Sequence, residues 1–331
     1  MILACHEDEV LEHMQAFIRD QLSLLKPVAD SWQPQDLLPD MAATGWEKKL
    51  EALRERAVHL SDEVLVVLVG NLVTEEALPS YQTWLNRNDG MKDETGADDS
   101  PWAVWTRGWT AEENRHGDVL NKYLYLSGRV NMRTVEVTIQ HLLRNGFDLK
   151  SGSDPYQSLV YAAFQERATK ISHLNTGRLA ESCGDGFLGH ICATIAGDEA
   201  RHEEAYKRFF GEIIRLDPSR AVTAFALMMR QKVAMPARFM CDGTDRDLFS
   251  QFAVVAQKSG IYTTRDYANV IEHLVDYWRI GSLTGLTGEA AQHQDFLCGL
   301  AEHYSSKADR VEEVLPSLPK KSFLWIFDRA A

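Results

Sequence analysis

Two short segments repeat one pairing of residue types that can bind metal. Glu113 stands three residues before His116, and Glu199 stands three residues before His202. On an α-helix, residues three apart lie on the same face, so each pair can direct a carboxylate and an imidazole at one point. A single Glu-x-x-His pair is common by chance on exposed helices, but two in one chain indicate a shared site. The sequence therefore predicts two helices that each supply a Glu and a His to metal.

Two further acidic positions can complete such a site. Glu75 or Glu76 ends the long apolar run that begins at Val64, and Glu166 lies among apolar residues. Counted from Glu75, the lone acid precedes its Glu-x-x-His pair by 38 residues in the first half of the chain and by 33 in the second. This near-equal spacing indicates one pair of helices used twice. A lone Glu from each of two helices, with a Glu-x-x-His pair from each of two others, is the ligand set of ferritin-like di-iron bundles.

Energetics favour the same interpretation. Burying an unpaired carboxylate is costly, so four of them in one bundle core require a compensating cation. Carboxylate oxygens combined with imidazole nitrogens suit iron or manganese better than a thiolate-rich zinc site would.

Length and charge limit the remaining possibilities. With 331 residues and 45% apolar content, the chain can bury a sizeable core in one large domain or two. A net charge of −13 argues against nucleic acid as a partner, because phosphate would be repelled over most of the surface. No run of eighteen apolar residues predicts a membrane span. The amino terminus resembles neither a secretory signal nor a transit peptide.

Apolar periodicity and helix-boundary residues predict an all-α protein, a ferritin-like four-helix di-iron bundle with additional surrounding helices. We find no convincing period-two strand pattern. The expected organisation is a single domain over 1–331, with an N-terminal helix and connector (1–40), the core bundle (61–216), and additional helices and a tail (217–331). The expected helices cover 8–25, 46–58, 61–88 with a kink at Pro79, 101–126, 132–143, 155 onward, a segment from 186 to 216, and 217–232, with later starts near 263 and 286.

Several longer strings carry a family resemblance. They are SWQPQD at 31–36, TEEALPSYQT at 74–83, DETGA at 93–97, WTAEENRHGDVLNKYLYLSGRV at 109–130, FQERATKISH at 164–173, DEARHE at 198–203 and WIFDR at 325–329. From about Leu11 to its end, the chain resembles the soluble acyl-[acyl-carrier-protein] desaturases, including their plant stearoyl 9-desaturases.

The resemblance implies a ligand set for two iron ions. It favours Glu75 over Glu76 and makes Glu112 a neighbour of the site. The implied ligands are Glu75, Glu113, His116, Glu166, Glu199 and His202.

The resemblance also implies the reaction and its partners. A cis double bond, expected at Δ9, is inserted into the saturated stearoyl or palmitoyl chain of an acyl carrier protein, with electrons from reduced ferredoxin and with O2 reduced to water. An unactivated methylene has no group on which acid or base catalysis could act, so removal of its hydrogen requires metal and oxygen. The family implies a homodimer. It implies a plastid stroma if the source is a plant or alga, and cytoplasm otherwise.

Three other residues have expected roles, and the role of Thr169 comes from the family resemblance. Thr169 matches an active-site threonine that assists proton delivery, although its hydroxyl could instead be satisfied by the carbonyl four residues earlier. Asp198 is expected to orient His116 by a hydrogen bond. Trp32, Asp198 and His116 are hypothesised to form the electron route from the surface.

An apolar tunnel must hold the acyl chain, and Tyr81, Trp84, Leu159 and Phe164 are candidates to line it. The sequence differs from the usual pattern of the plant stearoyl enzymes at Trp84, Arg87, Asn88 and the pair Ser158-Leu159. Two methylenes are worth about 1.6 kcal/mol of burial, or roughly fifteenfold in preference. A modest change in tunnel depth can therefore exchange stearoyl for palmitoyl preference.

Acyl carrier protein is acidic, so its docking needs clustered cations on this acidic chain. The candidates are Lys48, Lys49, Arg54 and Arg56, which otherwise form a solvated helix face. Other readings remain open for the whole chain. They are a related di-iron oxygenase with different regiospecificity, a ferritin-like iron- or peroxide-handling protein, and a helical interaction protein that has lost its metal.

Overall fold

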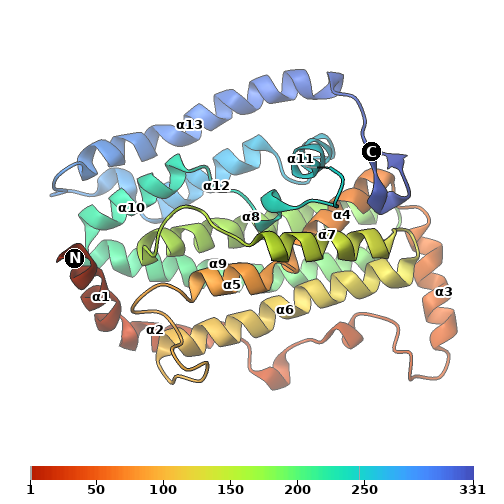
Figure 1. Ribbon diagram of the computed structural model, residues 1–331, viewed down its shortest axis with the longest axis horizontal. Coiled ribbons are helices and arrows are strands. Elements are labelled where there is room, and N and C mark those ends of the chain that lie inside the picture. The colour runs from red at the N-terminus through yellow and green to blue at the C-terminus, as the bar shows by residue number, and fades with distance from the viewer. Residues whose placement is uncertain (1, 246) are drawn as a thin grey trace.

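The computed structural model describes residues 2–245 and 247–331, and it is built almost entirely of α-helices (Figure 1). The helices are α1 (Ile2–His13), α2 (Gln15–Gln21), α3 (Trp46–Ala57), α4 (Asp62–Glu75), α5 (Leu78–Leu85), α6 (Pro101–Ser127), α7 (Met132–Asn145), α8 (Pro155–Ser182), α9 (Gly186–Leu216), α10 (Pro218–Arg230), α11 (Leu248–Lys258), α12 (Thr264–Tyr277) and α13 (Ala290–Val314). Two short strands, β1 (Ser322–Phe323) and β2 (Arg329–Ala330), pair antiparallel near the carboxyl end. The predicted all-α class is confirmed.

Four helices, α4, α6, α8 and α9, form the centre of the molecule (Figure 1). Helices α8 and α9 pack along their length as an antiparallel pair, because the turn between them is only a few residues long. The Asp185 carboxylate caps α9 by accepting from the Leu188 amide at 2.9 Å. Helix α6 begins with Pro101 after the Ser100 cap and ends at Ser127, and the next residue, Gly128, has a φ of 66°, the left-handed conformation that closes a helix.

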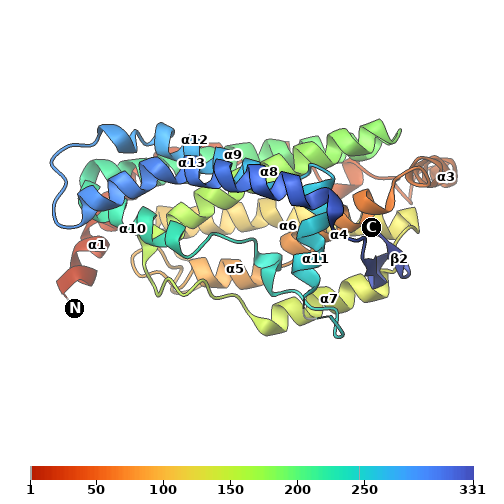
Figure 2. The same cartoon turned by 90° about the horizontal axis from the view of Figure 1, so that it is seen from above.

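The remaining helices cover this centre. Helices α12 and α13 pack against each other and α12 lies on α8, so together they form a layer over one face of the bundle (Figure 2). Helix α3 stands across the end of the bundle where α6 finishes (Figure 1). Helix α2 packs on α6 from the other side. The central helices are therefore buried along most of their surface.

Several predicted boundaries were wrong. The first predicted helix is interrupted at Met14, which separates α1 from α2. The helix predicted to kink at Pro79 instead ends four residues earlier, at Glu75, because a proline ring clashes with the carbonyl four positions before it. Helix α11 and the hairpin were missed. The last helix begins at Ala290 rather than near 286.

The segment Asp62–Leu85 is long and apolar enough to cross a membrane by composition alone. In the fold, 78% of its most apolar window is buried inside the protein. Its apolar character is that of a core element, with α4 packed against α6, α8 and α11.

Candidate metal centre

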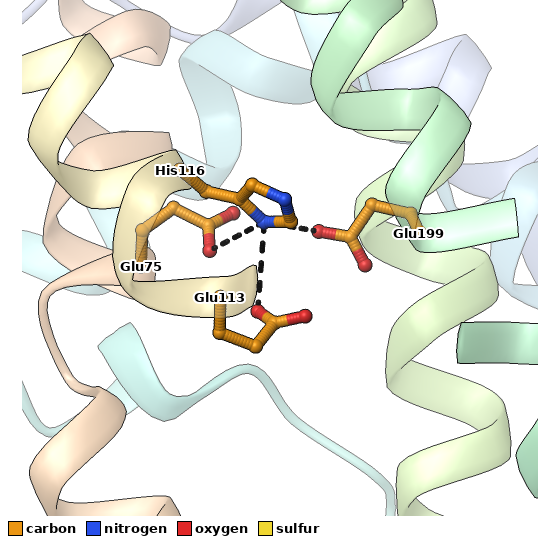
Figure 3. A group of neighbouring side chains, drawn as sticks. All are labelled: Glu75, Glu113, His116 and Glu199. Carbon is orange, nitrogen blue, oxygen red and sulfur yellow. Dashed lines mark ion pairs between the residues drawn. The ribbon is translucent and has the colours of Figure 1, made fainter. Parts of the chain in front are cut away.

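The six predicted ligands come together at the middle of the bundle in two overlapping groups. One group contains Glu75, Glu113, His116 and Glu199, and the other contains Glu113, Glu166, Glu199 and His202. In each group the ligand atoms lie within 4.8 Å of one another, and all are buried. Figure 3 shows the first group, with three carboxylates converging on the His116 ring.

The overlap gives the cluster the form of a two-ion site. Glu113 and Glu199 belong to both groups, so each carboxylate can bridge two positions. Glu75 and His116 complete one position, while Glu166 and His202 complete the other. The two positions are thus related by an approximate exchange of α6 with α9 and of α4 with α8.

The donor atoms fit metal. Among the described residues, Glu113 Oε1, His116 Nδ1, Glu199 Oε1 and His202 Nδ1 are buried without a hydrogen-bond partner. His202 Nδ1 lies 2.7 Å from Glu113 Oε1, and His116 Nδ1 lies 3.3 Å from Glu199 Oε1, yet neither contact is aligned as a hydrogen bond. Buried polar atoms without partners are costly in a folded protein. A cation between them would satisfy all four.

Both histidines are oriented from the opposite helix. His116 on α6 directs Nε2 toward Asp198 Oδ2 of α9 at 3.4 Å, and His202 on α9 directs Nε2 toward Glu112 Oε2 of α6 at 3.0 Å. Each acid therefore holds the histidine of the other helix and leaves its Nδ1 facing the cluster. The predicted Asp198–His116 contact is present. The equivalent role of Glu112 was missed, although the order acid-Glu-x-x-His in both segments could have revealed it.

A chain of contacts connects this arrangement to the surface. The half-buried Trp32 donates its indole N–H to Asp198 Oδ2 at 2.8 Å, and its ring stacks on that of His116 with centroids 6.1 Å apart. Arg201 bridges the two acids, with Nη2 at 2.6 Å from Glu112 and 2.5 Å from Asp198. The three residues hypothesised to carry electrons are thus contiguous.

The remaining carboxylate ligands are also held by hydrogen bonds. His173 Nε2 lies 2.8 Å from Glu75 Oε1, and the Trp109 indole N–H donates to Glu166 Oε1 at 3.0 Å. Sequence reasoning missed both contacts because they join residues far apart in the chain.

The Thr169 hydroxyl makes both of the contacts that the sequence left as alternatives, one to the helix backbone and one at the metal cluster. Its hydroxyl lies 2.9 Å from the Gln165 carbonyl, four residues earlier, and also 2.9 Å from Glu199 Oε2. A hydroxyl has one hydrogen to donate. Donation to Glu199 and donation to the helix backbone are therefore alternatives at this position.

Electrostatics place protons on the histidines when no cation is present. Burial opposes the charged imidazole, but the surrounding carboxylates outweigh it and raise the pKa of both His116 and His202. Burial alone would raise the pKa of Glu112, but hydrogen bonds with His202 and Arg201 lower it to about 2. Burial and the charge of Glu113 raise the pKa of Glu166. A bound dication would take the place of these protons.

A small, mostly apolar cavity of about 50 Å³ adjoins the cluster. Glu75, Glu113, Glu166 and Glu199 form part of its wall. The rest of the wall is mostly apolar: Thr74, Tyr81, Trp84, Leu85, Trp109, Tyr161, Ala162, Gln165, Thr169 and Pro236. An apolar chain can therefore lie directly against the ligands.

Trp84 occupies one part of this wall in a fixed orientation. Its ring meets Tyr161 and Phe147 edge-on at centroid distances of 5.2 and 5.6 Å, and the Arg87 guanidinium lies 5.6 Å from its centroid. Tyr81 and Trp84 line the cavity as predicted, whereas Leu159 does not. Leu159 is instead part of the packed core.

A second, larger cavity of about 270 Å³ is lined mainly by residues of α8, α11 and α12. Gln165 lines both cavities, whereas Phe164, predicted to line the acyl tunnel, lines only the second. Among the described residues, Gln165 Oε1 and the hydroxyls of Tyr262 and Tyr267, all from its wall, are buried without partners. Lys232 and Lys307 are exposed residues of the same wall.

The basic residues predicted on α3 are only partly free. Arg54 donates to the Leu126 carbonyl, and Arg56 lies 3.6 Å from Asp185 and packs on the Phe187 ring. Lys48 and Lys49 are exposed, but they alternate with the acidic residues of the same helix, Glu47, Glu51 and Glu55. The helix therefore carries less concentrated positive charge than its four cations indicate.

Comparison with known proteins agrees with this geometry. A solved structure of a putative acyl-ACP desaturase from Mycobacterium tuberculosis superposes with a TM-score of 0.56, covering 83% of this chain and 97% of that one at 17% identity. That likeness shows a shared fold.

Sequence relatives are much nearer. The chain is 52% identical over 322 residues to an acyl-[acyl-carrier-protein] desaturase of Cucumis sativus, covering 97% of this chain and 81% of that protein. It is 50% identical over 326 residues to stearoyl-[acyl-carrier-protein] 9-desaturase 1 of Arabidopsis thaliana, covering 97% and 82%. The family model described as fatty acid desaturase matches residues 6–327. With nearly the whole chain matched and the Glu/His cluster at its centre, this protein belongs to the fatty acid desaturase family, and the predicted resemblance is confirmed.

Proposed function

We propose that the chain is an acyl-[acyl-carrier-protein] desaturase that uses two iron ions, reduced ferredoxin and O2 to insert a cis double bond into a saturated acyl chain. One observation carries the proposal: the carboxylates of two overlapping groups of buried Glu and His residues form part of the wall of an apolar cavity. The relatives' names supply the substrate class, since those of Brassica napus and Arabidopsis thaliana are stearoyl-[acyl-carrier-protein] 9-desaturases.

In this proposal the six clustered residues hold the iron pair. Bound iron would supply the reductive activation of O2 that removal of hydrogen from an unactivated methylene requires. The protein's part is positional. Asp198 and Glu112 fix the imidazoles so that Nδ1 faces inward, while His173 and Trp109 fix the terminal carboxylates Glu75 and Glu166.

Thr169 supports proton handling at the same place. When its hydroxyl turns from the Gln165 carbonyl to Glu199, it presents a mobile proton at the edge of the cavity. Thr169→Val should leave iron binding unchanged and reduce the amount of product formed per O2 consumed. Unchanged coupling would remove this role.

The acyl chain in this proposal runs across both cavities. Its methyl end lies in the smaller chamber toward Trp84, and the reacting carbons lie beside the ligands. The larger cavity holds the polar arm that links the acyl chain to the carrier protein. Tyr262, Tyr267 and Gln165 of the cavity wall each have a polar group without a hydrogen-bond partner, and these groups can pair with amide groups of that arm. Gln165 marks the passage between them.

The carrier protein's docking surface then lies at the mouth of the larger cavity. Lys232 and Lys307 are exposed there, whereas the α3 cations are partly paired with their own protein. Reversing the charge of Lys232 and Lys307 should raise KM for the acyl-carrier substrate and weaken its salt dependence. Reversal of Lys48 and Lys49 should change KM little, and the opposite result would return docking to α3.

The compartment and assembly stay at the level of expectation. The relatives are named as chloroplastic, so for a plant or algal source we propose the plastid stroma. A homodimer and a single functional domain over the whole chain also stay predictions; size-exclusion chromatography with light scattering would test the first.

Product analysis by gas chromatography and mass spectrometry tests the central proposal. Iron-loaded protein is incubated with mixed palmitoyl- and stearoyl-carrier protein, reduced ferredoxin and O2. A cis-9 monoene supports the proposal, and the product ratio reports chain-length preference. A hydroxylated product or another bond position would indicate a related oxygenase. Absence of product with two irons bound would favour the ferritin-like alternative.

A further inference from the structure

Three of the eight tryptophans in the chain lie on one face of α6. Trp102, Trp105 and Trp109 are spaced three and four residues apart, and the same spacing continues to Glu113 and His116. All three indoles are buried, at 0, 1 and 3% exposure. The stripe is therefore the extension of the ligand-bearing face of α6 away from the metal centre.

The rings of this stripe are joined by two aromatic residues of α9. Tyr206 lies 5.9 Å from Trp109 and 5.8 Å from Trp105, measured between centroids. Phe209 lies 5.1 Å from Trp105 and 5.3 Å from Trp102. All four contacts are edge-to-face, the arrangement in which aromatic rings attract one another. An unbroken path of touching rings thus runs from Trp109 to Trp102.

One end of the path is bonded directly to the site. The Trp109 N–H donates to Glu166, a carboxylate of the ligand cluster, and Trp109 also lines the cavity beside it. At the middle of the path, Trp105 Nε1 is buried without a hydrogen-bond partner among the described residues. A phenylalanine at this position would also pack against the neighbouring rings, and it has no N–H group to leave without a partner. The indole at Trp105 therefore carries a polar cost that a phenyl ring at this position would avoid.

We propose that Trp109, Trp105 and Trp102 form an oxidation sink that draws oxidising equivalents away from the ligands when no acyl chain is in place. The inference rests on the proposed function, which supplies the oxidant. One electron leaves the Trp109 indole for the oxidised centre. Trp105 and then Trp102 refill the vacancy in turn, with the indole protons remaining on nitrogen. Trp102 is fully buried, so a soluble one-electron donor such as ascorbate or a thiol returns the missing electron by transfer through the protein. Without a donor, a second oxidising equivalent removes a further electron, and water adds to the indole ring with loss of two protons, which leaves a hydroxylated indole.

This path is separate from the proposed inlet for electrons. Trp32 approaches His116 through Asp198, whereas Trp109 contacts Glu166 of the other group. Electrons for the reaction would thus enter at one position, and surplus oxidation would leave from the other. The arrangement limits self-damage during idle turnover, a hazard wherever an active site generates strong oxidants.

The test uses iron-loaded, reduced protein exposed to O2 without acyl substrate. Freeze-quench electron paramagnetic resonance detects protein radicals, and peptide mass spectrometry locates added oxygen. We expect a tryptophan radical and oxygenated Trp105 and Trp102 in the wild type, with ascorbate suppressing both. Trp105→Phe should reduce oxygenation of Trp102 to background, and should increase severalfold the loss of iron-binding capacity per O2 consumed.

Two controls keep the result interpretable. Trp278→Phe removes a buried indole that packs on Phe210 and Phe225, outside the stripe, and should behave as the wild type. Both substitutions replace a buried indole with a smaller ring and should lower the thermal unfolding midpoint, so similar midpoints for Trp105→Phe and Trp278→Phe separate loss of the path from loss of folding. Oxygenation confined to cavity residues in the wild type, or equal damage in both variants, would overturn the sink alone. Iron-loaded protein that consumed no O2 would overturn the sink together with the proposed function.

Discussion

Glu112 on α6 lies 3.0 Å from Nε2 of His202 on α9, and Asp198 on α9 lies 3.4 Å from Nε2 of His116 on α6. Each helix thus supplies the hydrogen-bond partner for the other helix's imidazole. Arg201 contacts both acids and joins the two halves. The orientation of each histidine therefore depends on the packing of α6 against α9, not on its own helix alone.

The first prediction follows from this exchange. Asp198→Asn should weaken metal binding through His116, and Glu112→Gln should do so through His202, each by about 10–100-fold. Chelator competition measures the affinity. Glu212→Gln, at a half-buried acid of α9 that pairs with Arg215 outside the metal cluster, serves as the control and should bind metal as the wild type does. Equal affinity in all three variants would contradict the orienting role.

Metal binding should release protons. The pKa values of His116 and His202 are raised in the metal-free protein, so both imidazoles carry a proton that the metal must displace. Affinity should consequently rise with pH throughout the range below those raised pKa values. Calorimetric titrations in two buffers of different ionisation enthalpy would reveal the released protons; identical apparent enthalpies would exclude the exchange.

Trp84 should limit acyl chain length. Trp84→Leu enlarges the chamber beside the ligands, and room for two methylenes is worth about 1.6 kcal/mol, roughly fifteenfold in preference. The ratio of stearoyl to palmitoyl product from a mixed substrate should rise by up to that factor. Leu159→Val, a change in a core residue outside the cavity, should leave the ratio unaltered. A ratio that moved equally in both variants would assign the effect to general loosening.

Trp32→Phe should slow turnover driven by reduced ferredoxin, because it removes the hydrogen bond to Asp198 at 2.8 Å. A single turnover of chemically prereduced protein should proceed at the wild-type rate, since that reaction needs no electron transfer from a partner. Unchanged ferredoxin-driven turnover would remove Trp32 from the electron route.

Glu203 should make stability dependent on acid. This buried carboxylate contacts Lys170 and lies 2.8 Å from Arg167 and 3.0 Å from Lys207. Burial alone would raise its pKa, but hydrogen bonds from His273 and Lys170 outweigh it and lower the pKa below the ordinary 4.5. The stabilisation is therefore present above pH 4.5 and is lost as pH falls toward the lowered pKa.

Glu203→Gln tests that dependence. It should reduce the free energy of unfolding at neutral pH by about 3–5 kcal/mol, because it leaves partly buried cations without their carboxylate. It should also flatten the acid side of the stability curve, measured by urea unfolding at several pH values. The exposed Glu313→Gln provides the comparison. A mutant that kept the wild-type pH profile would show that other groups determine acid stability.

Spacing predicted much of this molecule, and what it could not predict depends on tertiary contact. The Glu-x-x-His pairs and the apolar runs were sufficient for an all-α chain and for five of the clustered residues, whereas the choice of Glu75 over Glu76 came from the family resemblance. Nothing local in the sequence connects His173 to Glu75 or Trp109 to Glu166, because those pairs are 98 and 57 residues apart.

Boundaries failed for a different reason. The end of α4 at Glu75 could have been predicted from the geometry of Pro79, but the sequence analysis predicted a kinked helix there. This boundary also matters for the metal cluster, because the position where α4 ends determines where the Glu75 carboxylate points.

Glu75 is the last residue of α4, whereas the other five clustered residues lie several turns inside long helices. Helix ends fray more readily than helix interiors. In the proposed two-ion site the two positions would therefore be mechanically unequal: the one formed with Glu75 and His116 would be compliant, and the one formed with Glu166 and His202 would be stiff. Exchange of an ion would begin at the compliant position, so protein recovered with a single ion per chain would carry it between Glu166 and His202.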